Sequence, residues 1–349
     1  MVAITSTTTG EAGVEQPLFR ELSDILECPE AREPIRVERD QFIVPSTGKR
    51  YSVADGIPNL FVPNTGAPEG TNVTELVKRF YEETPFPNYD DFDSRESLAA
   101  KAQKNVFAAM LDAQIPKGAV VLEVGCGTGQ LTNFLGMSWT RRVFGGDICL
   151  NSLRLAKAFR DRYSIRNAAF LQMNLFHPPF RDESFDLIIS SGVLHHTGDP
   201  EGGMAALAKK LKPGGIITIG LYNNYARLPT LWRRWLFERF GASMHFLDPR
   251  LRDNRHNIRR VRAWYADQYK PPYESKHSMD EVLKWFARHG IEFLSGIPHP
   301  DGTAFSSEDR LFERHSPGSR LTRESTQLGM LLAGGSDGGL FIVIGRKLG

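Results

Sequence analysis

Residues 121–129 read VLEVGCGTG, and this stretch decides how the rest of the chain is organised. Its first four residues have the largely apolar, β-branched character of a buried strand, and three glycines at alternate positions predict a tight turn before a helix. Because Gly125, Gly127 and Gly129 lack Cβ atoms, a ligand can approach the backbone closely, and the helix start offers unpaired N–H groups. The order of strand, glycine turn and helix predicts a cradle for a cofactor.

The spacing of glycines and acids narrows the choice of cofactor. A dinucleotide fingerprint would require glycine at position 130, where the chain has Gln130, and the lysine of a phosphate-binding P-loop is absent. The next predicted strand, 142–146, is followed by Asp147, about 20 residues after the glycines, where an acid meets a ribose diol. Glu123 can accept hydrogen bonds from ligand hydroxyls or an ammonium group. Together these residues predict a cofactor that contains a nucleoside.

Predicted strands alternate with helical segments through the centre of the chain. The strands are expected at 120–124, 142–146, 168–173, 185–191 and 215–222. This alternation is typical of a parallel sheet with right-handed crossovers, in which ligands bind outside the carboxyl ends of the strands.

Five ordered segments of this region resemble the class I S-adenosylmethionine-dependent methyltransferase family: VLEVGCGTG, VFGGDI, MNLF, FDLIISSGVLHH and LKPGG. The resemblance covers residues 106–222 closely, and two closing strands are expected at 291–297 and 339–347. It implies an α/β fold with a doubly wound, mostly parallel, seven-stranded Rossmann-like sheet. It also implies that S-adenosyl-L-methionine is the cofactor.

The resemblance assigns cofactor-binding roles to residues near the carboxyl ends of these strands. Asp147 would bind the ribose hydroxyls, and Ile148 would flank the adenine ring. Asn174 stands where the family usually has Asp, and its amide oxygen can still accept from the adenine amino group, while Leu175 would offer its backbone N–H. The full predicted set is Glu123, Gly125, Cys126, Gly127, Gly129, Asp147, Ile148, Asn174, Leu175 and Ser191.

Three residues near the expected methyl donor are candidates for a catalytic role: His195, His196 and Tyr222. A histidine with its ordinary pKa of about 6.5 can act as a base, and the histidine pair follows the fourth predicted strand. Leu-His-His-Thr is also common at this place among family members of varied chemistry, and methyl transfer depends chiefly on alignment of the reacting atoms. A structural role therefore stays open beside base catalysis.

Two stretches outside the strands are expected to contact the substrate. Residues 81–92 read YEETPFPNYDDF and resemble segments that fold over the cofactor in some bacterial members, with plain packing on the sheet as the alternative. Residues 223–277 form a basic, aromatic insertion with twelve Lys or Arg, five Asp or Glu, and predicted helices over 228–240 and 253–269. The predicted substrate-binding residues are Tyr81, Tyr89, Asn223, Asp267, Tyr269 and His277.

Three interpretations of this insertion stay open. The first is a helical hairpin on the sheet edge, with buried tryptophans and solvated arginines. The second is a basic amphipathic lid that rests on a membrane surface and collects a lipid or quinone-like substrate, and the third is RNA contact through arginines and stacking rings. A net charge of +2 argues against strong attraction to nucleic acid. We expect a small-molecule substrate, with peripheral membrane contact through the lid as a further expectation.

The N-terminal part of the chain is expected to differ from the sheet domain. The segments are a flexible tail at 1–18, a small β-ribbon module at 19–63, a linker with a cofactor-covering helical segment at 64–104, and the methyltransferase domain at 105–349. The module resembles the zinc-ribbon activator domain of tRNA methyltransferases, but Cys28 is its single remaining cysteine and Ala31 stands at the next ligand position. One cysteine cannot hold zinc, so no metal is expected.

Composition and charge place the expected protein in the cytoplasm. The chain has 349 residues, 41% hydrophobic residues, three cysteines, no signal-peptide pattern and no apolar run long enough to span a membrane. We expect a methyltransferase that acts on an acidic, aromatic or lipid- or quinone-like metabolite by in-line methyl transfer. RNA methylation and a non-catalytic cofactor-binding module that recruits a partner are the alternatives, and the oligomeric state is left open.

Overall fold

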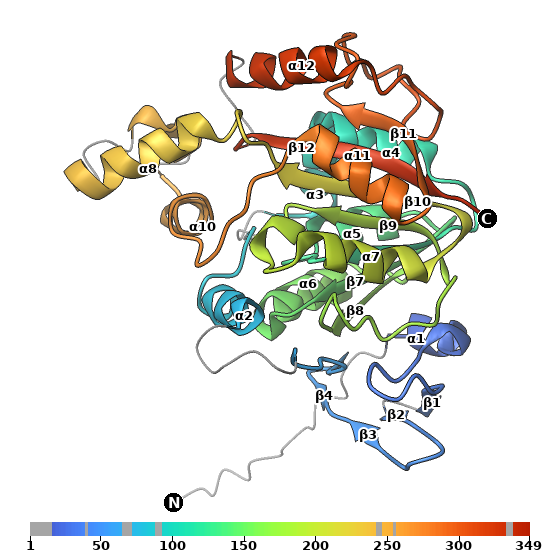
Figure 1. Ribbon diagram of the computed structural model, residues 1–349. Coiled ribbons are helices and arrows are strands. Elements are labelled where there is room, and N and C mark those ends of the chain that lie inside the picture. Colours follow the sequence, from blue (N-terminus) through green and yellow to red (C-terminus); the bar gives the residue numbers. More distant parts are fainter. Residues whose placement is uncertain are drawn as a thin grey trace, which may run out of the picture.

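The computed structural model describes residues 16–38, 41–64, 72–87, 93–241, 246–253, 256–332 and 338–349. Its centre is a sheet of seven strands, which follow each other across the sheet as β11 (Ile291–Ile297), β12 (Leu340–Lys347), β10 (Leu211–Tyr222), β9 (Phe185–Ser191), β6 (Val120–Val124), β7 (Arg142–Asp147) and β8 (Ala168–Gln172) (Figure 1). β12 is antiparallel to both of its neighbours, and the pairs from β10 to β8 are parallel. The predicted seven-stranded, mostly parallel α/β fold is confirmed.

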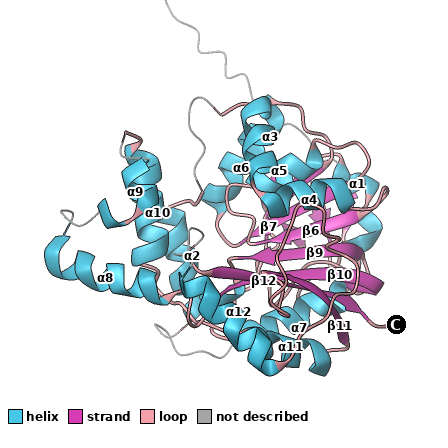
Figure 2. Ribbon diagram, turned by 90° about the horizontal axis from the view of Figure 1, so that it is seen from above, coloured by secondary structure: helices cyan, strands magenta, loops and turns pink. Residues whose placement is uncertain are grey.

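Helices cover both faces of this sheet (Figure 2). One face carries α4 (Val106–Gln114), α5 (Gln130–Gly136) and α6 (Leu150–Arg162), and the other carries α7 (Pro200–Lys210) and α11 (Met279–Arg288). Strands buried on both sides read as continuous apolar runs, as in the fully buried AAFLQ of β8.

The helix before the first parallel strand is interrupted. The periodicity predicts one helix over 98–114, but the structure has α3 (Arg95–Lys104) and then α4. Asn105 separates them with an extended backbone, and its side-chain oxygen caps α4 by accepting from the Ala108 N–H at 3.1 Å. A residue that prefers to cap a helix therefore divides the predicted helix in two.

The chain before residue 64 completes the free edge of β8. The Gln16 amide donates to the Phe170 carbonyl (3.0 Å) and accepts from the Phe170 N–H (2.7 Å), so it pairs like a strand residue. α1 (Leu18–Glu21) and the short helix η1 (Ser23–Ile25) follow, with Leu18 in the core. The prediction of a flexible tail over 1–18 is therefore wrong for 16–18, and 1–15 lie outside the described residues.

The N-terminal module is held by apolar packing onto the sheet domain. It contains β1 (Arg36–Glu38), β2 (Gln41–Ile43), β3 (Arg50–Tyr51), β4 (Val53–Ala54) and β5 (Ile57–Pro58). Leu26 bridges to Phe180, and both belong to the same core cluster. Cys28 is buried, and its sulfur accepts from the Ala31 N–H at 3.3 Å and lies 2.9 Å from the Tyr51 hydroxyl. Within the described ranges, no three His, Cys, Asp or Glu side chains gather in a group that could hold a metal ion.

The insertion forms a helical lobe beside the sheet (Figure 1, Figure 2). Its helices are α8 (Leu228–Phe240), α9 (Pro249–Asp253) and α10 (Ile258–Tyr269), and we call these three helices the lid lobe. The lobe has a small core of its own, centred on Phe237, Leu251 and Tyr269. In the part of the chain that the structure describes, no helix combines the length and the apolar character that crossing a membrane requires.

Candidate active site

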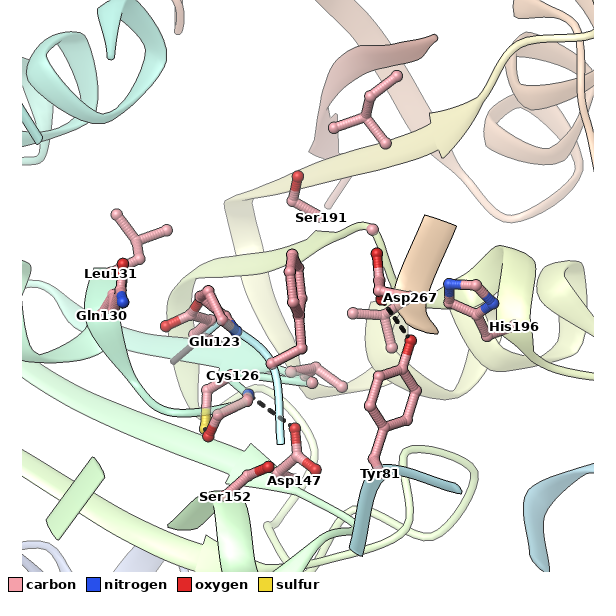
Figure 3. Close-up of a pocket in the computed structure, with 18 of the residues that line it drawn as sticks. Tyr81, Glu123, Cys126, Gln130, Leu131, Asp147, Ser152, Ser191, His196 and Asp267 are labelled. Carbon is pink, nitrogen blue, oxygen red and sulfur yellow. Dashed lines mark hydrogen bonds between the residues drawn. The ribbon is translucent and has the colours of Figure 1, made fainter. Parts of the chain in front are cut away.

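A cavity of about 940 Å³ lies at the carboxyl ends of the parallel strands (Figure 3). Its walls come from the loops after β6 to β10, from α2 (Val73–Glu83) with the segment after it, and from the lid lobe. Every predicted cofactor-binding residue except Gly129 lines this cavity. Four other predicted residues also line it, namely Tyr81, His196, Tyr222 and Asp267. The parallel topology brings these distant segments to one edge of the sheet.

The glycine turn forms one wall of the cavity. Gly125 and Gly127 have φ values of +66° and +53°, and a Cβ on Gly127 would lie 2.2 Å from the Phe86 carbonyl oxygen. Gly129 lies behind the turn as the N-cap of α5, where a Cβ would come within 2.7 Å of the Phe170 ring. Gly129 therefore does not line the cavity, because this glycine allows close packing of α5 on the sheet instead.

Two partly buried carboxyl groups lie at the ends of the neighbouring strands β6 and β7. Asp147 accepts hydrogen bonds from the N–H groups of Gly127 and Cys149, each at 2.8 Å. Burial raises the pKa of Asp147 to about 6, and these N–H donors oppose the rise. Burial likewise raises the pKa of Glu123 to about 7, against the hydrogen bond that it receives from the Thr132 hydroxyl. Both acids face a space in which a ligand with several hydrogen-bond donors would satisfy them.

The predicted adenine side of the cavity is mainly apolar. Ile148, Met173 and Leu175 line it. The Asn174 amide donates to the Val62 carbonyl (2.8 Å), and its oxygen accepts from a backbone N–H two residues along the chain (3.1 Å). That oxygen keeps a second lone pair, so its predicted role toward an adenine amino group stays a prediction.

The segment after α2 covers the glycine turn. The Glu82 carboxylate accepts from the N–H groups of Leu150 (2.8 Å) and Asn151 (3.1 Å), which anchors the end of α2 on the start of α6. The Tyr81 hydroxyl donates to Asp267 of the lid lobe at 2.8 Å, as Figure 3 shows. The predicted contact residue Tyr89 lies outside the described residues. The N-terminal segment and the lid lobe thus meet directly above the cavity.

The two histidines of η2 (Leu194–His196) differ in their surroundings. His195 lies behind the cavity wall, where its Nδ1 accepts from the Tyr222 N–H (3.3 Å) and burial lowers its pKa well below the ordinary value. His196 lines the cavity beside Tyr81 and Asp267 (Figure 3), and its Nδ1 lies 2.8 Å from the Tyr273 carbonyl oxygen. Because a carbonyl only accepts, Nδ1 carries the proton of the neutral ring, and Nε2 keeps a lone pair.

Tyr222 is held between two planar groups. The His195 ring stacks on one face with 3.9 Å between centroids, and the Arg227 guanidinium lies 3.7 Å from the ring centroid. The Tyr222 hydroxyl accepts from Gln268 Nε2 (2.8 Å), which also donates to Asp267 (2.8 Å). Burial holds the pKa of the Tyr222 hydroxyl well above its ordinary value. The phenol is therefore neutral and rigidly placed.

The interpretation of the insertion as a hairpin with solvated arginines is wrong for Arg227. Its side chain is fully buried, donates to both Glu274 oxygens (3.0 and 2.7 Å), and also bonds to Gln268 (2.5 Å). That interpretation also predicts buried tryptophans, but Trp232 and Trp235 are more than half exposed. A buried arginine is tolerated here because a carboxylate and several carbonyl oxygens replace its water.

Three further predicted residues lie outside the cavity. The Asn223 amide donates to Gln327 of α12 (Arg320–Leu332) at 2.8 Å, on the opposite side of the chain from the adjacent Tyr222. Tyr269 is packed in the core of the lid lobe, because it lies two helical positions from Asp267 and so faces another direction. His277 contacts Ser275 (2.8 Å) and Glu281 (3.1 Å) instead of the cavity.

Several cavity residues were not predicted: Phe86, Arg250, Trp264 and Gln268. The aromatic character of residues 81–92 and of the insertion was a signal for Phe86 and Trp264. Their rings approach each other with 6.2 Å between centroids, across the junction of the N-terminal segment and the lid lobe. Nothing in the local pattern distinguished Gln268 from other polar residues of its helix.

The central part of the chain is similar to known methyltransferases. Residues 122–219 match the family described as methyltransferase domain. An uncharacterized protein of Synechococcus sp. is 28% identical over 58% of this chain and 55% of its own length. The ubiquinone biosynthesis O-methyltransferase of Dictyostelium discoideum is 27% identical over 45% of this chain and 48% of its own.

A solved structure of magnesium protoporphyrin IX methyltransferase from Synechocystis PCC 6803 aligns with a TM-score of 0.45 and 12% identity, over 80% of this chain and all of that one. The match to the two curated relatives spans about half of their length. Residues 122–219, which include most of β6, the strands β7 to β9 and most of β10, are the part of this chain that matches the methyltransferase domain family.

Proposed function

We propose that this protein is an S-adenosylmethionine-dependent methyltransferase that acts on a small molecule. The observation that carries the proposal is the pair of partly buried acids, Glu123 and Asp147, beside a glycine turn in one cavity. Ribose hydroxyls and an amino-acid ammonium group are the donors that two such carboxylates accept from. Ile148 and Leu175 offer the apolar walls that a purine ring needs.

The acceptor would occupy the part of the cavity that the cofactor residues leave. The predicted cofactor residues come from the ends of β6, β7, β8 and β9, whereas the cavity continues past β10 toward β12 and β11. That continuation is lined by apolar side chains, namely Phe107, Ile297, Phe305, Leu340 and Ile342. A chamber with an apolar lining favours a metabolite with an apolar body over a nucleic-acid strand, which needs an open basic groove.

The residues around the junction of the two parts would align the acceptor. S-adenosylmethionine supplies a methyl group on a positively charged sulfur, and the acceptor atom displaces that sulfur in line. His196 would accept the acceptor proton at Nε2, since its Nδ1–H is fixed by the Tyr273 carbonyl. Tyr81, Asp267 and Gln268 join the N-terminal segment to the lid lobe and would keep water from the reacting atoms.

Calorimetric titration of S-adenosylhomocysteine, with NADH as the control ligand, tests the cofactor. We expect binding of S-adenosylhomocysteine and no binding of NADH, and the reverse result would refute the proposal. Incubation with methyl-labelled S-adenosylmethionine and a panel of aromatic acids, quinols and lipid-like alcohols then tests the acceptor. Cofactor binding without any product would favour a non-catalytic module, and salt-dependent binding of RNA would favour RNA methylation.

A further inference from the structure

The outer side of α8 carries a line of exposed large side chains. Leu228, Trp232, Trp235 and Arg239 follow each other at helical spacing on one side of the helix, opposite the buried Phe237. The exposed fractions of the three apolar side chains are 47%, 58% and 56%. Both views place α8 at the outer edge of the lid lobe, away from the sheet (Figure 1, Figure 2).

One more aromatic side chain enlarges this surface, because Phe240 is 51% exposed and its ring centroid lies 6.4 Å from that of Trp235. A single exposed tryptophan such as Trp139 is ordinary in a folded protein, but four large apolar side chains exposed on one helix mark an interaction surface. We call this surface the outer α8 face, and it comprises Leu228, Trp232, Trp235, Arg239 and Phe240.

The exposed charge of the lid lobe is mainly positive. Among the described residues of 223–277, the exposed bases are Arg239, Arg250, Arg252, Arg262 and Lys270, and the exposed acids are Glu238 and Asp253. Glu274 and Asp248 are directed into the lobe, where Glu274 pairs with Arg227 (2.7 Å) and Asp248 is buried. Glu238 is the exposed acid of α8, whereas the Arg239 guanidinium lies 5.6 Å from the centroid of the exposed Phe240 ring.

We propose that the outer α8 face docks on the surface of a membrane that contains anionic lipid. Exposed tryptophans and arginines on one helix are typical of interfacial helices, because the indole ring lies at the headgroup level and the guanidinium pairs with lipid phosphate. The helix would lie along the membrane surface and would not cross it. Charge complementarity selects an anionic surface over a neutral one.

The lobe that carries the outer α8 face also lines the cavity, so membrane docking bears on which acceptor reaches the cavity. Trp264 of α10 and Arg250 of α9 line the cavity, and both belong to the same small lobe as the outer α8 face. A lid lobe resting on lipid would therefore hold the cavity close to the bilayer. If the proposed methyltransferase function holds, on which this step rests, the acceptor is an apolar molecule that the enzyme takes from the membrane.

Co-sedimentation with vesicles tests the docking. We expect the full chain to bind vesicles of phosphatidylcholine with phosphatidylglycerol, to bind pure phosphatidylcholine vesicles more weakly, and to lose affinity as salt rises. The double variant with Trp232→Ala and Trp235→Ala should weaken vesicle binding by about tenfold for each tryptophan that the membrane buries in the wild type. Trp139→Ala is the matched control, since it removes an exposed tryptophan from another part of the surface and should leave vesicle binding unchanged.

Two results would overturn the docking proposal. One is equal vesicle binding by the wild type and the double tryptophan variant. The other is no vesicle binding together with a dimer, measured by light scattering, that the double variant loses, because this would assign the outer α8 face to a second copy of the chain. S-adenosylhomocysteine titration of the same variants separates the two proposals: unchanged affinity with lost vesicle binding supports docking, and no affinity in the wild type refutes the methyltransferase function alone.

Discussion

Replacement of Asp147 by Asn is the sharpest test of the cofactor site. The Asp147 carboxylate accepts from the N–H groups of Gly127 and Cys149 at 2.8 Å, so it both holds the glycine turn and retains lone pairs for a ligand. Asn keeps the size of the side chain but has one acceptor oxygen and no charge. Asp147→Asn should therefore remove at least one charge-assisted hydrogen bond to ribose, and it also loses one of the two bonds that hold the turn, because the Gly127 and Cys149 N–H groups bond to different carboxylate oxygens.

The expected loss follows from the energy of such bonds. A hydrogen bond to a charged group contributes about 1.5–3 kcal/mol, which corresponds to a loss of about ten- to 150-fold in affinity for S-adenosylhomocysteine. A second expected effect concerns how the affinity for S-adenosylhomocysteine depends on pH. Because burial raises the pKa of Asp147 to about 6 and ligand donors favour the ionised form, wild-type affinity should fall about tenfold between pH 7 and pH 5. Asp147→Asn should lose this part of the pH dependence.

Calorimetry between pH 5 and pH 8 measures both effects. Glu123→Gln is the control, because it removes an acid whose pKa is about 7 and should leave the step near pH 6 in place. Wild-type affinity in Asp147→Asn would refute the assignment of this carboxylate to the ribose. An unchanged pH profile in that variant would show that another group carries the titration.

Three further predictions concern the turn, the histidines and the lid lobe. Gly127→Ala places a Cβ 2.2 Å from a backbone oxygen and should weaken S-adenosylhomocysteine binding at least tenfold in calorimetry, since about 1.4 kcal/mol of strain suffices; full affinity would contradict the closed turn. His196→Gln should lower kcat by about 10²- to 10⁴-fold if the ring is a base, and a loss below tenfold at every pH would leave it only an alignment role. His195→Gln should instead lower the melting temperature, which scanning calorimetry measures. Arg227→Ala should cost about 3–5 kcal/mol of unfolding free energy in urea titration, and Arg227→Met with Glu274→Leu should recover most of it; an unaffected single variant would contradict a buried ion pair.

The part of the site that sequence reasoning predicted depends on local geometry. A strand, a glycine turn and a helix form from adjacent residues, so 121–129 specified a turn whose backbone lines a cavity. The position of Asp147 at the end of β7 follows because parallel strands end at the same edge of the sheet. Nearly all predicted cofactor residues therefore line the cavity. The exception is Gly129, which allows the close packing of α5 on the sheet.

Two of the predicted substrate residues, Asn223 and Tyr269, lie outside the cavity because of side-chain direction. Tyr222 and Asn223 are adjacent, yet one lines the cavity and the other bonds to α12, because successive residues of an extended chain point to opposite sides. Asp267 and Tyr269 differ in the same way on a helix, where a separation of two positions turns the side chain to another face.

The sequence by itself determined the doubly wound sheet, the glycine turn and the acids at its edge, because each depends on short-range pattern and on the common direction of parallel strands. Tertiary structure alone decided which side of α8 is buried. Its periodicity places Trp232 on an apolar side, but the buried Arg227–Glu274 pair and the small core around Phe237 turn that side outward. Such a choice depends on contacts between segments about 40 residues apart, and a pattern read along one helix does not contain them.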